Sequence, residues 1–324
     1  MVDITSIKQP VSEELKRFEQ AFFDAFHSDN QQLEEIYQYL LENTGKQIRP
    51  VLTLLSSKLC GNVTDASIEA AVSLELMHTA SLLHDDVIDE ASERRGKPSV
   101  CARWGSKTAI LSGDYLLASS FMATIVIGDT RIWNILGRVG KMLAEGELLQ
   151  LDNADGHTVD EDRYFSVINR KTATLFAACT ESGALAAQAS DEQARQLRIF
   201  GENLGLAFQI KDDVFDYSDS RITGKPTGND MKEGKMTLPL IHALQHSTQQ
   251  ERDDILARFG QVYRDESQIA IIQEFVQKKG GIEYAEKKME TFRNVAIEAL
   301  SSFEENDVKR ALIDALNFAT QRNH

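Results

Sequence analysis

The sequence has few of the residues that mark disulfide-stabilised, nucleic-acid-binding or membrane-spanning proteins. Its cysteines, Cys60, Cys101 and Cys179, are scattered, odd in number and without paired spacing, which argues against a disulfide framework or a zinc site and predicts a cytoplasmic protein. Lysine and arginine total 35 against 50 acidic residues, and a net charge of -15 argues against a nucleic-acid partner. The longest nearly uncharged apolar run, Tyr115 to Ile127, is too short to span a bilayer, and no signal-peptide region opens the chain. We therefore expect a soluble protein with no transmembrane segment.

Proline is also scarce, with 5 in 324 residues, and no segment shows the sustained alternation of apolar and polar residues that a sheet requires. No shift in composition marks a linker, so we expect residues 1–324 to form a single large all-α domain. The longest irregular stretch, Ser218 to Gly234, predicts a loop with a role at a site. Apolar residues recur at three- and four-residue steps and predict helices within 33–41, 65–89, 109–127, 132–151, 164–187, 194–217, 269–276 and 282–300.

One aspartate-rich pattern occurs twice, 127 positions apart (212 minus 85), at the ends of two of these helices. Like charges one helical turn apart destabilise a helix by roughly 0.2–0.5 kcal/mol per pair, and negative charge at a helix C-terminus opposes the macrodipole. A solvated helix end would explain one cluster but not the match between two. Because carboxylates are hard ligands, the clusters predict magnesium ions that hold a diphosphate between them. The candidate metal ligands are Asp85, Asp86, Asp89, Asp212, Asp213 and Asp216.

Several basic or polar residues stand where they could complete a site for two phosphate groups. Lys46 and Arg49 lie in a segment where a turn feeds a helix, whose first backbone amides would add to anion binding. Arg94 and Arg95 follow the first aspartate cluster. Taken singly, each of these residues is an ordinary surface residue, so the prediction depends on the joint pattern. The other members of the pattern are Lys171, Thr172, Gln209, Lys225, Lys232 and Lys235.

The joint pattern resembles the trans-isoprenyl diphosphate synthases, which include farnesyl, geranylgeranyl and longer-chain polyprenyl diphosphate synthases. The resemblance extends from Gly45 to Pro239 and includes both aspartate clusters, Gly45–Pro50, Arg94-Arg95-Gly96 and the run Gly228–Pro239. Thr44 departs from the family, which often has a second glycine there. The resemblance implies an isoprenoid synthase fold with a central active-site cavity, a homodimer, and two or three Mg²⁺ ions with bound diphosphate. It also implies a prenyltransferase that condenses isopentenyl diphosphate with an allylic diphosphate.

The same resemblance implies a role for each candidate residue. Those that would bind isopentenyl diphosphate are Lys46, Arg49, His78 and Arg95. Those that would hold the allylic diphosphate for catalysis, the carboxylates through magnesium, are Asp85, Asp86, Asp89, Arg94, Lys171, Thr172, Gln209, Asp212, Asp213, Asp216, Lys225 and Lys235. The sequence offers no dedicated base for the final proton, and in the family the departing diphosphate is the usual candidate.

Small residues before the first aspartate cluster predict a long product. Ala80 and Ser81 lie about one helical turn before Asp85, where bulky residues in the family stop the chain early. An extended isoprene unit is about as long as one turn of ~5.4 Å, so several additions could be housed beside this helix. We expect a C30–C50 all-trans product, centred on octaprenyl, with Met77 as a candidate for a deeper floor. The alternative is ordinary small-residue helix packing and a shorter geranylgeranyl or farnesyl product.

Two other functions would use a similar fold. A terpene cyclase would not need a second diphosphate site such as Lys46, Arg49 and Arg95 provide, nor usually a second aspartate motif of the same type. An inactive subunit that binds prenyl diphosphates would be expected to have lost aspartates, whereas all six are present. We therefore favour the synthase.

Overall fold

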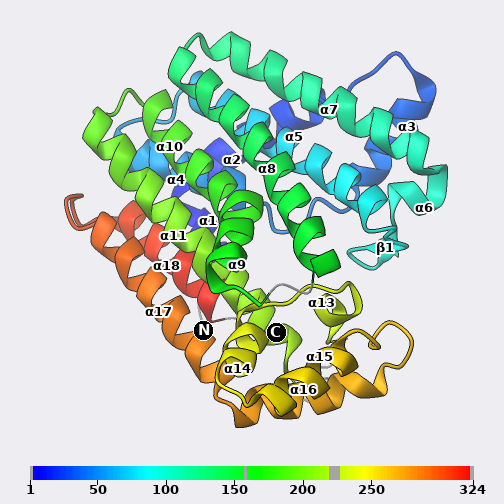
Figure 1. The fold of residues 1–324 in the computed structure, drawn as a ribbon. Helices are drawn as coiled ribbons and strands as arrows, with labels where there is room; N and C mark the ends of the chain where they lie inside the picture. The colour runs from blue at the N-terminus through cyan, green and yellow to red at the C-terminus, as the bar shows by residue number, and fades with distance from the viewer. Residues whose placement is uncertain (1–2, 157–158, 219–226, 322–324) are drawn as a thin grey trace. The chain divides into compact units, whose positions relative to one another are not determined.

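The computed structural model describes residues 3–156, 159–218 and 227–321, and these are mainly helical (Figure 1). The prediction of an all-α fold is confirmed. Two short turns are irregular: η1 (Gln9–Val11) is a 3-10 turn and η2 (Asn169–Ala173) is a π-helical turn. The α-helices are α1 (Ile4–Lys8), α2 (Ser12–Asp24), α3 (Gln31–Leu41), α4 (Ile48–Cys60), α5 (Asp65–Ile88), α6 (Val100–Trp104), α7 (Ser106–Ile127), α8 (Thr130–Gly156), α9 (Glu161–Ile168), α10 (Thr174–Ala186), α11 (Asp191–Asp216), α13 (Asn229–Lys232), α14 (Leu238–Gln245), α15 (Gln249–Phe259), α16 (Ser267–Lys278), α17 (Gly281–Ala299) and α18 (Asp307–Thr320).

One small hairpin interrupts the helices, which the sequence did not predict. Strand β1 (Glu93–Arg94) pairs antiparallel with β2 (Lys97–Pro98). The residues between them, Arg95 and Gly96, have φ of +55° and +76°. Positive φ at both central residues is typical of a type I′ turn, which matches the twist of paired strands. A hairpin this short is too brief for an alternating pattern to reveal.

The chain forms two compact units, each built from several segments. Unit 1 comprises Met1–Gly140, Leu175–Gly201 and Ala299–Phe318. Unit 2 comprises Lys141–Thr174, Glu202–Glu298 and Ala319–His324. The single domain expected from the sequence stays a prediction.

Helix α5 forms the core of unit 1 and ends at the first aspartate cluster. Its N-terminus has a capping box, in which the Thr64 hydroxyl accepts from the Ser67 amide and the Ser67 hydroxyl accepts from the Thr64 amide. Helices α2, α4 and α7 all pack against α5, so its buried residues lie on every side rather than on one stripe. Ser73 and Thr124 meet at 2.6 Å and satisfy each other's buried hydroxyls between α5 and α7.

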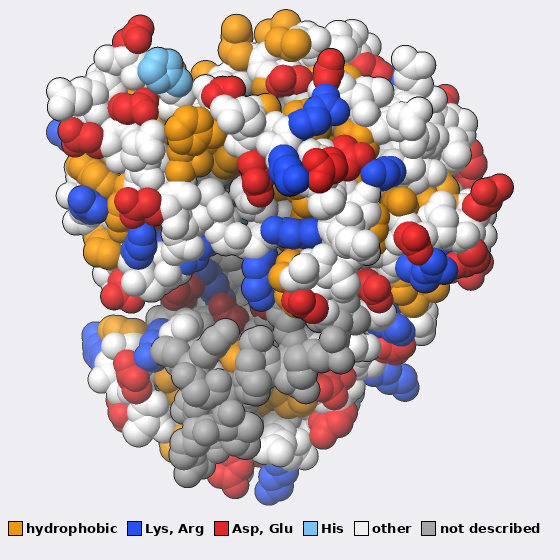
Figure 2. All heavy atoms as spheres, turned by 180° about the vertical axis from the view of Figure 1, so that it is seen from behind, with side chains coloured by type: hydrophobic (Ala, Val, Ile, Leu, Met, Phe, Trp, Pro, Cys, Tyr) orange, Lys and Arg blue, Asp and Glu red, His pale blue; other side chains and the backbone are white. Residues whose placement is uncertain are grey.

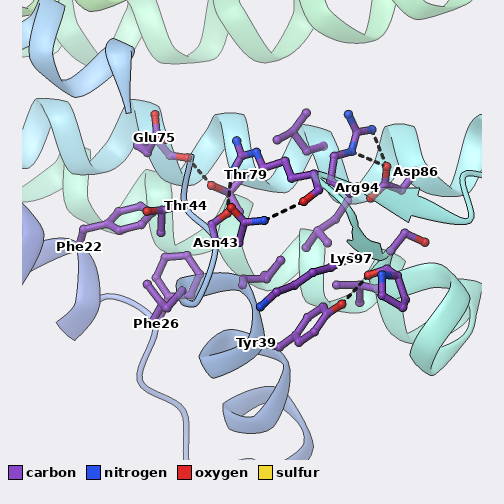
Figure 3. Close-up of a pocket in the computed structure, with 18 residues that line it drawn as sticks. Phe22, Phe26, Tyr39, Asn43, Thr44, Glu75, Thr79, Asp86, Arg94 and Lys97 are labelled. Carbon is purple, nitrogen blue, oxygen red and sulfur yellow. Dashed lines mark hydrogen bonds and ion pairs between the residues drawn. The ribbon is translucent and has the colours of Figure 1, made fainter. Parts of the chain in front are cut away.

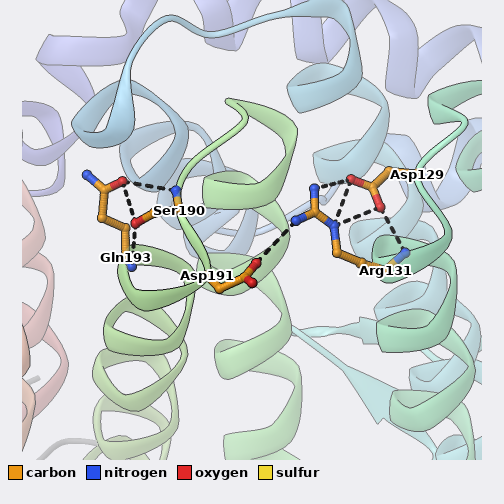
Figure 4. A network of polar contacts seen from close by, with 5 residues as sticks. All are labelled: Asp129, Arg131, Ser190, Asp191 and Gln193. Carbon is orange, nitrogen blue, oxygen red and sulfur yellow. Dashed lines mark hydrogen bonds and ion pairs between the residues drawn. The ribbon is translucent and has the colours of Figure 1, made fainter.

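A polar network fixes the starts of α8 and α11 within unit 1 (Figure 4). The Asp129 carboxylate accepts from the backbone amide of Arg131 at 2.8 Å and from its guanidinium at 2.7 Å. The same guanidinium reaches Asp191 at 3.5 Å, and Ser190 donates to Gln193 at 3.1 Å. Such exposed ion pairs contribute little stability, typically about 0–1 kcal/mol, so we interpret the network as setting the positions of the two helix starts.

Helix α7 is the one described helix that is long and apolar enough to cross a membrane by length and composition. It is longer than the run Tyr115 to Ile127 that the sequence singled out, because it begins at Ser106. One side packs along α5, where Ser112, Leu116 and Ser120 are buried. The opposite side is exposed, so α7 is not a fully covered core helix.

Unit 2 contains a separate apolar core around α14, α15 and α16. Tyr217, at the end of α11, packs into it. A second cluster joins α9 to α11 and α14 and lies beside the second aspartate cluster. The core around α14, α15 and α16 contains Met231, Leu240, Leu244, Ile255, Phe259, Ile272 and Val276.

Charged side chains of both signs are interspersed over the face shown in Figure 2. The acidic excess is therefore not gathered there into a field of one sign.

Candidate active site

A left-handed turn in unit 1 positions Lys46 and Arg49. Gly45 and Gln47 have φ of +73° and +52°, and α4 begins at Ile48. Arg49 therefore lies in the first turn of a helix, as the sequence predicted. Glycine adopts this conformation at no steric cost, whereas Gln47 carries backbone strain, a feature often found near functional sites.

Both cations pack on aromatic rings that are distant in the sequence. The Lys46 Nζ atom lies 4.8 Å from the ring centroid of Phe318 in α18, and the Arg49 guanidinium lies 5.0 Å from that of Phe176 in α10. These contacts stabilise a cation over the ring face. No sequence pattern predicted these two contacts, and the region after Pro239 had no assigned role.

Arg49 and His78, which are half-buried, form a polar cluster with the buried Glu75. The Arg49 Nη1 atom lies 2.8 Å from His78 Nε2. Because a guanidinium only donates, Nε2 must accept and the imidazole proton lies on Nδ1. Burial, with the charges of Arg49 and Arg95, holds the pKa of His78 well below its usual value, so the ring is neutral at neutral pH. Burial raises the pKa of Glu75, while Arg49 and Arg95 oppose that shift.

Arg95 is held at the hairpin turn by Asn43, the residue labelled in Figure 3. Its Nη1 donates to the Asn43 carbonyl at 2.6 Å, and the Asn43 amide donates to the Arg95 carbonyl at 3.1 Å. These residues line a cavity of about 70 Å³ together with Glu75, Thr79 and apolar side chains of α2, α3 and α5. The structure thus brings Arg95 close enough to influence Arg49 and His78, as the sequence required of a shared phosphate site.

The first aspartate cluster does not present three equivalent carboxylates. Asp86 is buried and accepts from Arg94 Nε at 2.8 Å, while burial raises its pKa and Arg94 opposes that shift. Asp85 is half-buried and Asp89 is exposed at the C-terminus of α5. Asp85 and Asp89, one turn apart, are therefore the better-placed ligands for a surface cation. His84 contacts Asp114 of α7 at 3.3 Å, a pair that the sequence did not single out.

A cavity of about 200 Å³ in unit 2 gathers most of the remaining candidates. Lys171, Thr172, Gln209, Asp213 and Lys235 line the same cavity, so the structure brings these predicted residues together. Lys171 and Thr172 belong to the π-helical turn η2, a feature frequent at functional sites. The sequence missed further lining residues: Gln150, Tyr164 and Asp230.

Asp213 is the buried centre of a hydrogen-bonded chain in this cavity. Tyr164 donates to its Oδ2 at 2.5 Å, and Gln209 Nε2 donates to its Oδ1 at 2.9 Å. Thr172 in turn donates to Gln209 Oε1 at 2.8 Å. Burial raises the pKa of Asp213 to about 7, and these donors oppose the shift. Tyr164 could have been found from its position seven residues, or two helical turns, before Lys171.

Asp216 and Asp230 lie beside this chain with different roles. Asp216 is buried and accepts from the backbone amides of Asn229 at 3.0 Å and Asp230 at 3.1 Å, so it ties α11 to the start of α13. Burial and the neighbouring carboxylates raise the pKa of Asp230 to about 8. Asp212 is exposed at the end of α11. Asp230 lies in the run Gly228–Pro239 but was not among the predicted ligands.

The candidate lysines from Lys171 to Lys235 have different acidic partners. Lys171 pairs with Glu147 and donates to Gln150 at 3.1 Å. Lys235 reaches Glu233 at 2.5 Å, and Lys232 reaches Glu266 at 2.9 Å. Lys232 does not line the cavity. Lys225 lies outside the described residues.

The predicted chain-length residues lie in the core of unit 1. Ala80 and Met77 are buried on α5, and Ser81 is half-buried with its hydroxyl donating to the His78 carbonyl at 2.9 Å. Gly140 of α8 lies beside the Met77 methyl, since a Cβ atom there would be 3.7 Å away. The two aspartate clusters belong to different units, so their facing arrangement stays a prediction.

The donors fit magnesium better than a preformed all-protein metal site. Among the described residues, no three His, Cys, Asp or Glu side chains converge closely enough to hold a metal ion. Mg²⁺ usually takes one or two carboxylates and completes its octahedral shell with water and phosphate oxygens. Asp85 with Asp89, and Asp212 with Asp213, provide hard oxygen donors in such small numbers.

Comparisons with known proteins agree on one family. The family model described as polyprenyl synthetase matches residues 30–277. Octaprenyl diphosphate synthase of Escherichia coli (strain K12) is 31% identical over 323 residues, covering 99% of this chain and 100% of the relative. A short chain isoprenyl diphosphate synthase of Methanothermobacter thermautotrophicus is 36% identical over 292 residues, 89% of each chain. A polyprenyl synthase from Caulobacter crescentus CB15, solved in complex with calcium and isoprenyl diphosphate, is 32% identical and superposes with a TM-score of 0.92 over 100% of this chain and 99% of that one.

Proposed function

The chain belongs to the polyprenyl synthetase family and is a trans-prenyltransferase; from this premise we propose that it adds isopentenyl diphosphate repeatedly to an allylic diphosphate. The observation that supports the proposal best is the presence of two separate sets of basic side chains, each suited to bind a diphosphate. One is the cluster of Lys46, Arg49 and Arg95 in unit 1. The other is the cavity of unit 2, lined by Lys171 and Lys235. A terpene cyclase would need only one such set.

In this proposal, isopentenyl diphosphate binds to the unit 1 cluster. Lys46, Arg49 and Arg95 supply positive charge, and the neutral His78 supplies an Nδ1–H donor. Arg49 and Lys46 are restrained by their aromatic partners, and Arg95 by Asn43, so little side-chain entropy is lost on binding. The phosphate would then hold the carbon–carbon double bond in place for attack.

The allylic diphosphate is held through the aspartates, with Lys171, Lys235, Thr172 and Gln209 as direct donors. Asp85, Asp89, Asp212 and Asp213 would hold Mg²⁺, which when bound offsets the charge that develops on the leaving diphosphate. The complex of calcium and isoprenyl diphosphate in the Caulobacter relative supports a divalent cation in this role. The number of ions is proposed to be two or three.

The chemical step exchanges one bond for another. The allylic carbon–oxygen bond breaks with its electron pair on the diphosphate, and the double bond of isopentenyl diphosphate attacks the allylic cation. This attack forms a carbon–carbon bond and leaves a cation on the isopentenyl unit, and loss of a proton from the carbon next to that cation forms the new double bond. Burial raises the pKa of Asp213, a candidate metal ligand, and of Asp230, which lines the same cavity; we keep the departing diphosphate as the base. Water must be kept out, since it would quench the cation.

We further propose a long product, C30–C50 and centred on octaprenyl. Its support is the small, buried Ala80 and the half-buried Ser81, one turn before Asp85 on α5. Met77, about 12 Å before Asp85 along the helix, is the proposed deeper floor. The relatives include both octaprenyl and short-chain synthases, so the product must be measured.

We also propose that the enzyme is a cytoplasmic homodimer that associates through α7. Leu111, Tyr115, Met122 and Val126 recur at helical steps along α7, and their exposed fractions are 66%, 37%, 64% and 75%. An apolar stripe of this kind marks an interaction surface. Sedimentation of wild type as a dimer and of Met122→Lys as a monomer would support the proposal. A wild-type monomer that binds lipid vesicles through the same stripe would contradict it.

Initial rates of incorporation of labelled isopentenyl diphosphate test the proposed activity. Incorporation should require both an allylic diphosphate and Mg²⁺, and Asp85→Asn or Asp212→Asn should abolish it. Glu90→Gln, which removes an exposed carboxylate just after the first cluster, is the matched control and should leave the rate unchanged. Release of inorganic diphosphate from the allylic substrate alone, with a cyclic hydrocarbon product, would favour a cyclase instead.

A further inference from the structure

Lys171 is held by two side chains of α8 that no assigned role explains. Glu147 forms an ion pair with the Lys171 ammonium and is 8% exposed. Gln150, one turn further along α8, accepts from the same ammonium at 3.1 Å and donates to Glu147 at 3.2 Å. We propose that Glu147 and Gln150 are positioning residues that aim the Lys171 ammonium at the allylic diphosphate. The inference rests on the proposed function of the same cavity.

The direction of the ammonium follows from its donors. A lysine ammonium has three N–H groups and no acceptor. The Lys171 ammonium donates to Gln150 and forms an ion pair with Glu147, so it keeps N–H capacity for a ligand in the cavity that Lys171 lines. Without these partners, the long side chain would rotate freely and lose entropy when a diphosphate bound. Glu147 and Gln150 therefore restrain the Lys171 side chain before a diphosphate binds, so less entropy is lost on binding. They also fix the position of the charge.

The backbone around the pair is built for this close approach. Gly146 precedes Glu147, and a Cβ atom on it would lie 2.9 Å from Lys171 Cγ, 3.2 Å from the Lys171 amide nitrogen and 2.8 Å from Arg170 Cβ. Only glycine lets α8 approach the π-helical turn so closely. The π-helical turn η2 contains Lys171 and Thr172, so the backbone departs from a regular α-helix at these two residues. The close approach at Gly146 and the π-helical turn thus both lie next to the residue that carries this ammonium.

A second acidic residue on α8 provides a matched control. Glu145 lies two residues before Glu147 and approaches Arg170, the neighbour of Lys171, at 3.9 Å. The Glu145 side chain is 56% exposed, whereas the side chain of Glu147, taken alone, is 10% exposed. Glu145→Gln therefore removes one negative charge from the same helix and a contact with the same π-helical turn. It removes no contact with Lys171.

Steady-state kinetics of Glu147→Gln, Glu145→Gln and Gln150→Leu in the full-length protein test the inference. We expect Glu147→Gln to lower kcat/KM for the allylic diphosphate by roughly 10- to 100-fold, the range typical when a residue that orients a ligand-binding group is lost. The KM for isopentenyl diphosphate should not change. Gln150→Leu should have a smaller effect of the same kind, and Glu145→Gln none.

A double-mutant cycle separates positioning from a merely structural ion pair. Lys171→Ala should lower activity and thermal stability, because it leaves a buried carboxylate without its partner. Adding Glu147→Gln should cost no further activity and should recover stability. If Glu147→Gln raises both KM values equally, or costs as much activity without Lys171 as with it, the pair is structural and the inference is wrong.

Binding of inorganic diphosphate in the presence of Mg²⁺, measured by calorimetry, gives a readout independent of turnover. Glu147→Gln should weaken binding and Glu145→Gln should not; equal affinities for wild type and Glu147→Gln would overturn the inference. A wild-type protein that incorporates no isopentenyl diphosphate would contradict the proposed function, while this comparison would still decide whether Glu147 positions Lys171 for a diphosphate.

Discussion

A Cβ atom on Gly45 would lie 2.8 Å from the guanidinium carbon of Arg95. The turn before α4 and the hairpin after α5 therefore meet where glycine leaves room for the arginine. Gly45 also has a φ of +73°, a conformation that only glycine adopts without cost. The proposed isopentenyl diphosphate site thus depends on the close packing of two turns.

Replacing Gly45 with alanine should displace Arg95 and weaken binding of isopentenyl diphosphate. We expect a higher KM for that substrate, an unchanged KM for the allylic diphosphate, and a loss of stability of about 1–2 kcal/mol from the left-handed backbone. Gly96→Ala is the control, because Gly96 has a similar φ of +76° but no atom within 4 Å of an added Cβ. Equal KM values for the two variants would contradict the role of this packing.

Removing the Tyr164 hydroxyl should weaken magnesium binding. The hydrogen bond from Tyr164 lowers the pKa of Asp213, so Tyr164→Phe should raise that pKa above about 7 and reduce the ionised fraction at neutral pH. The Mg²⁺ concentration for half-maximal activity should rise at pH 7 and approach the wild-type value at pH 9. Tyr284→Phe, which removes a hydroxyl bonded to Glu161 outside the cavity, serves as the control and should behave like wild type.

Acid should destabilise the protein partly through His78. Its pKa is depressed in the folded state, so the unfolded chain binds more protons as the pH falls below about 6.5. The stability that the neutral His78 contributes is thus present above about pH 6.5 and lost below it. Thermal melting from pH 7.5 to 5 should show a smaller decrease for His78→Gln than for wild type. The exposed His27→Gln is the control; a decrease as small for His27→Gln as for His78→Gln would contradict this assignment.

A bulky side chain at position 80 should shorten the product. Ala80 is 1% exposed on α5, so Ala80→Phe would fill space in the proposed path of the growing chain. We expect chromatography of the products to show a shift to C20 or shorter, with the first condensation retained. An Ala80→Phe enzyme that still makes the wild-type product would show that the chain grows elsewhere.

Much of the fold was predictable because its signals are local. The three- and four-residue spacing of apolar side chains predicted α5, α7, α8 and α11. The observed ends of these helices lie within a few residues of the predicted ends. The glycine at position 45 and the start of α4 were also readable. The hairpin at Arg95 was not, because two residues per strand carry no periodicity.

The site was predictable in its charged residues but not in what holds them. Lys171 could be singled out by motif, yet its partners Glu147 and Gln150 lie about six helical turns earlier along the chain and have no motif that the sequence alone revealed. Phe318 beneath Lys46 was equally hidden, because tertiary packing decides which distant residues meet. Asp86 and Asp216 stay predicted ligands, and the structure adds that their carboxylates accept from Arg94 and from backbone amides, contacts that no motif revealed.

Elongation with labelled isopentenyl diphosphate, farnesyl diphosphate and Mg²⁺, with products separated by chain length, tests the central claim most directly. We predict a ladder of products that ends between C30 and C50. A product that stops at C20 would keep the enzyme class and contradict the proposed long chain. No elongation, under conditions in which a known synthase is active, would contradict the account of the active site itself.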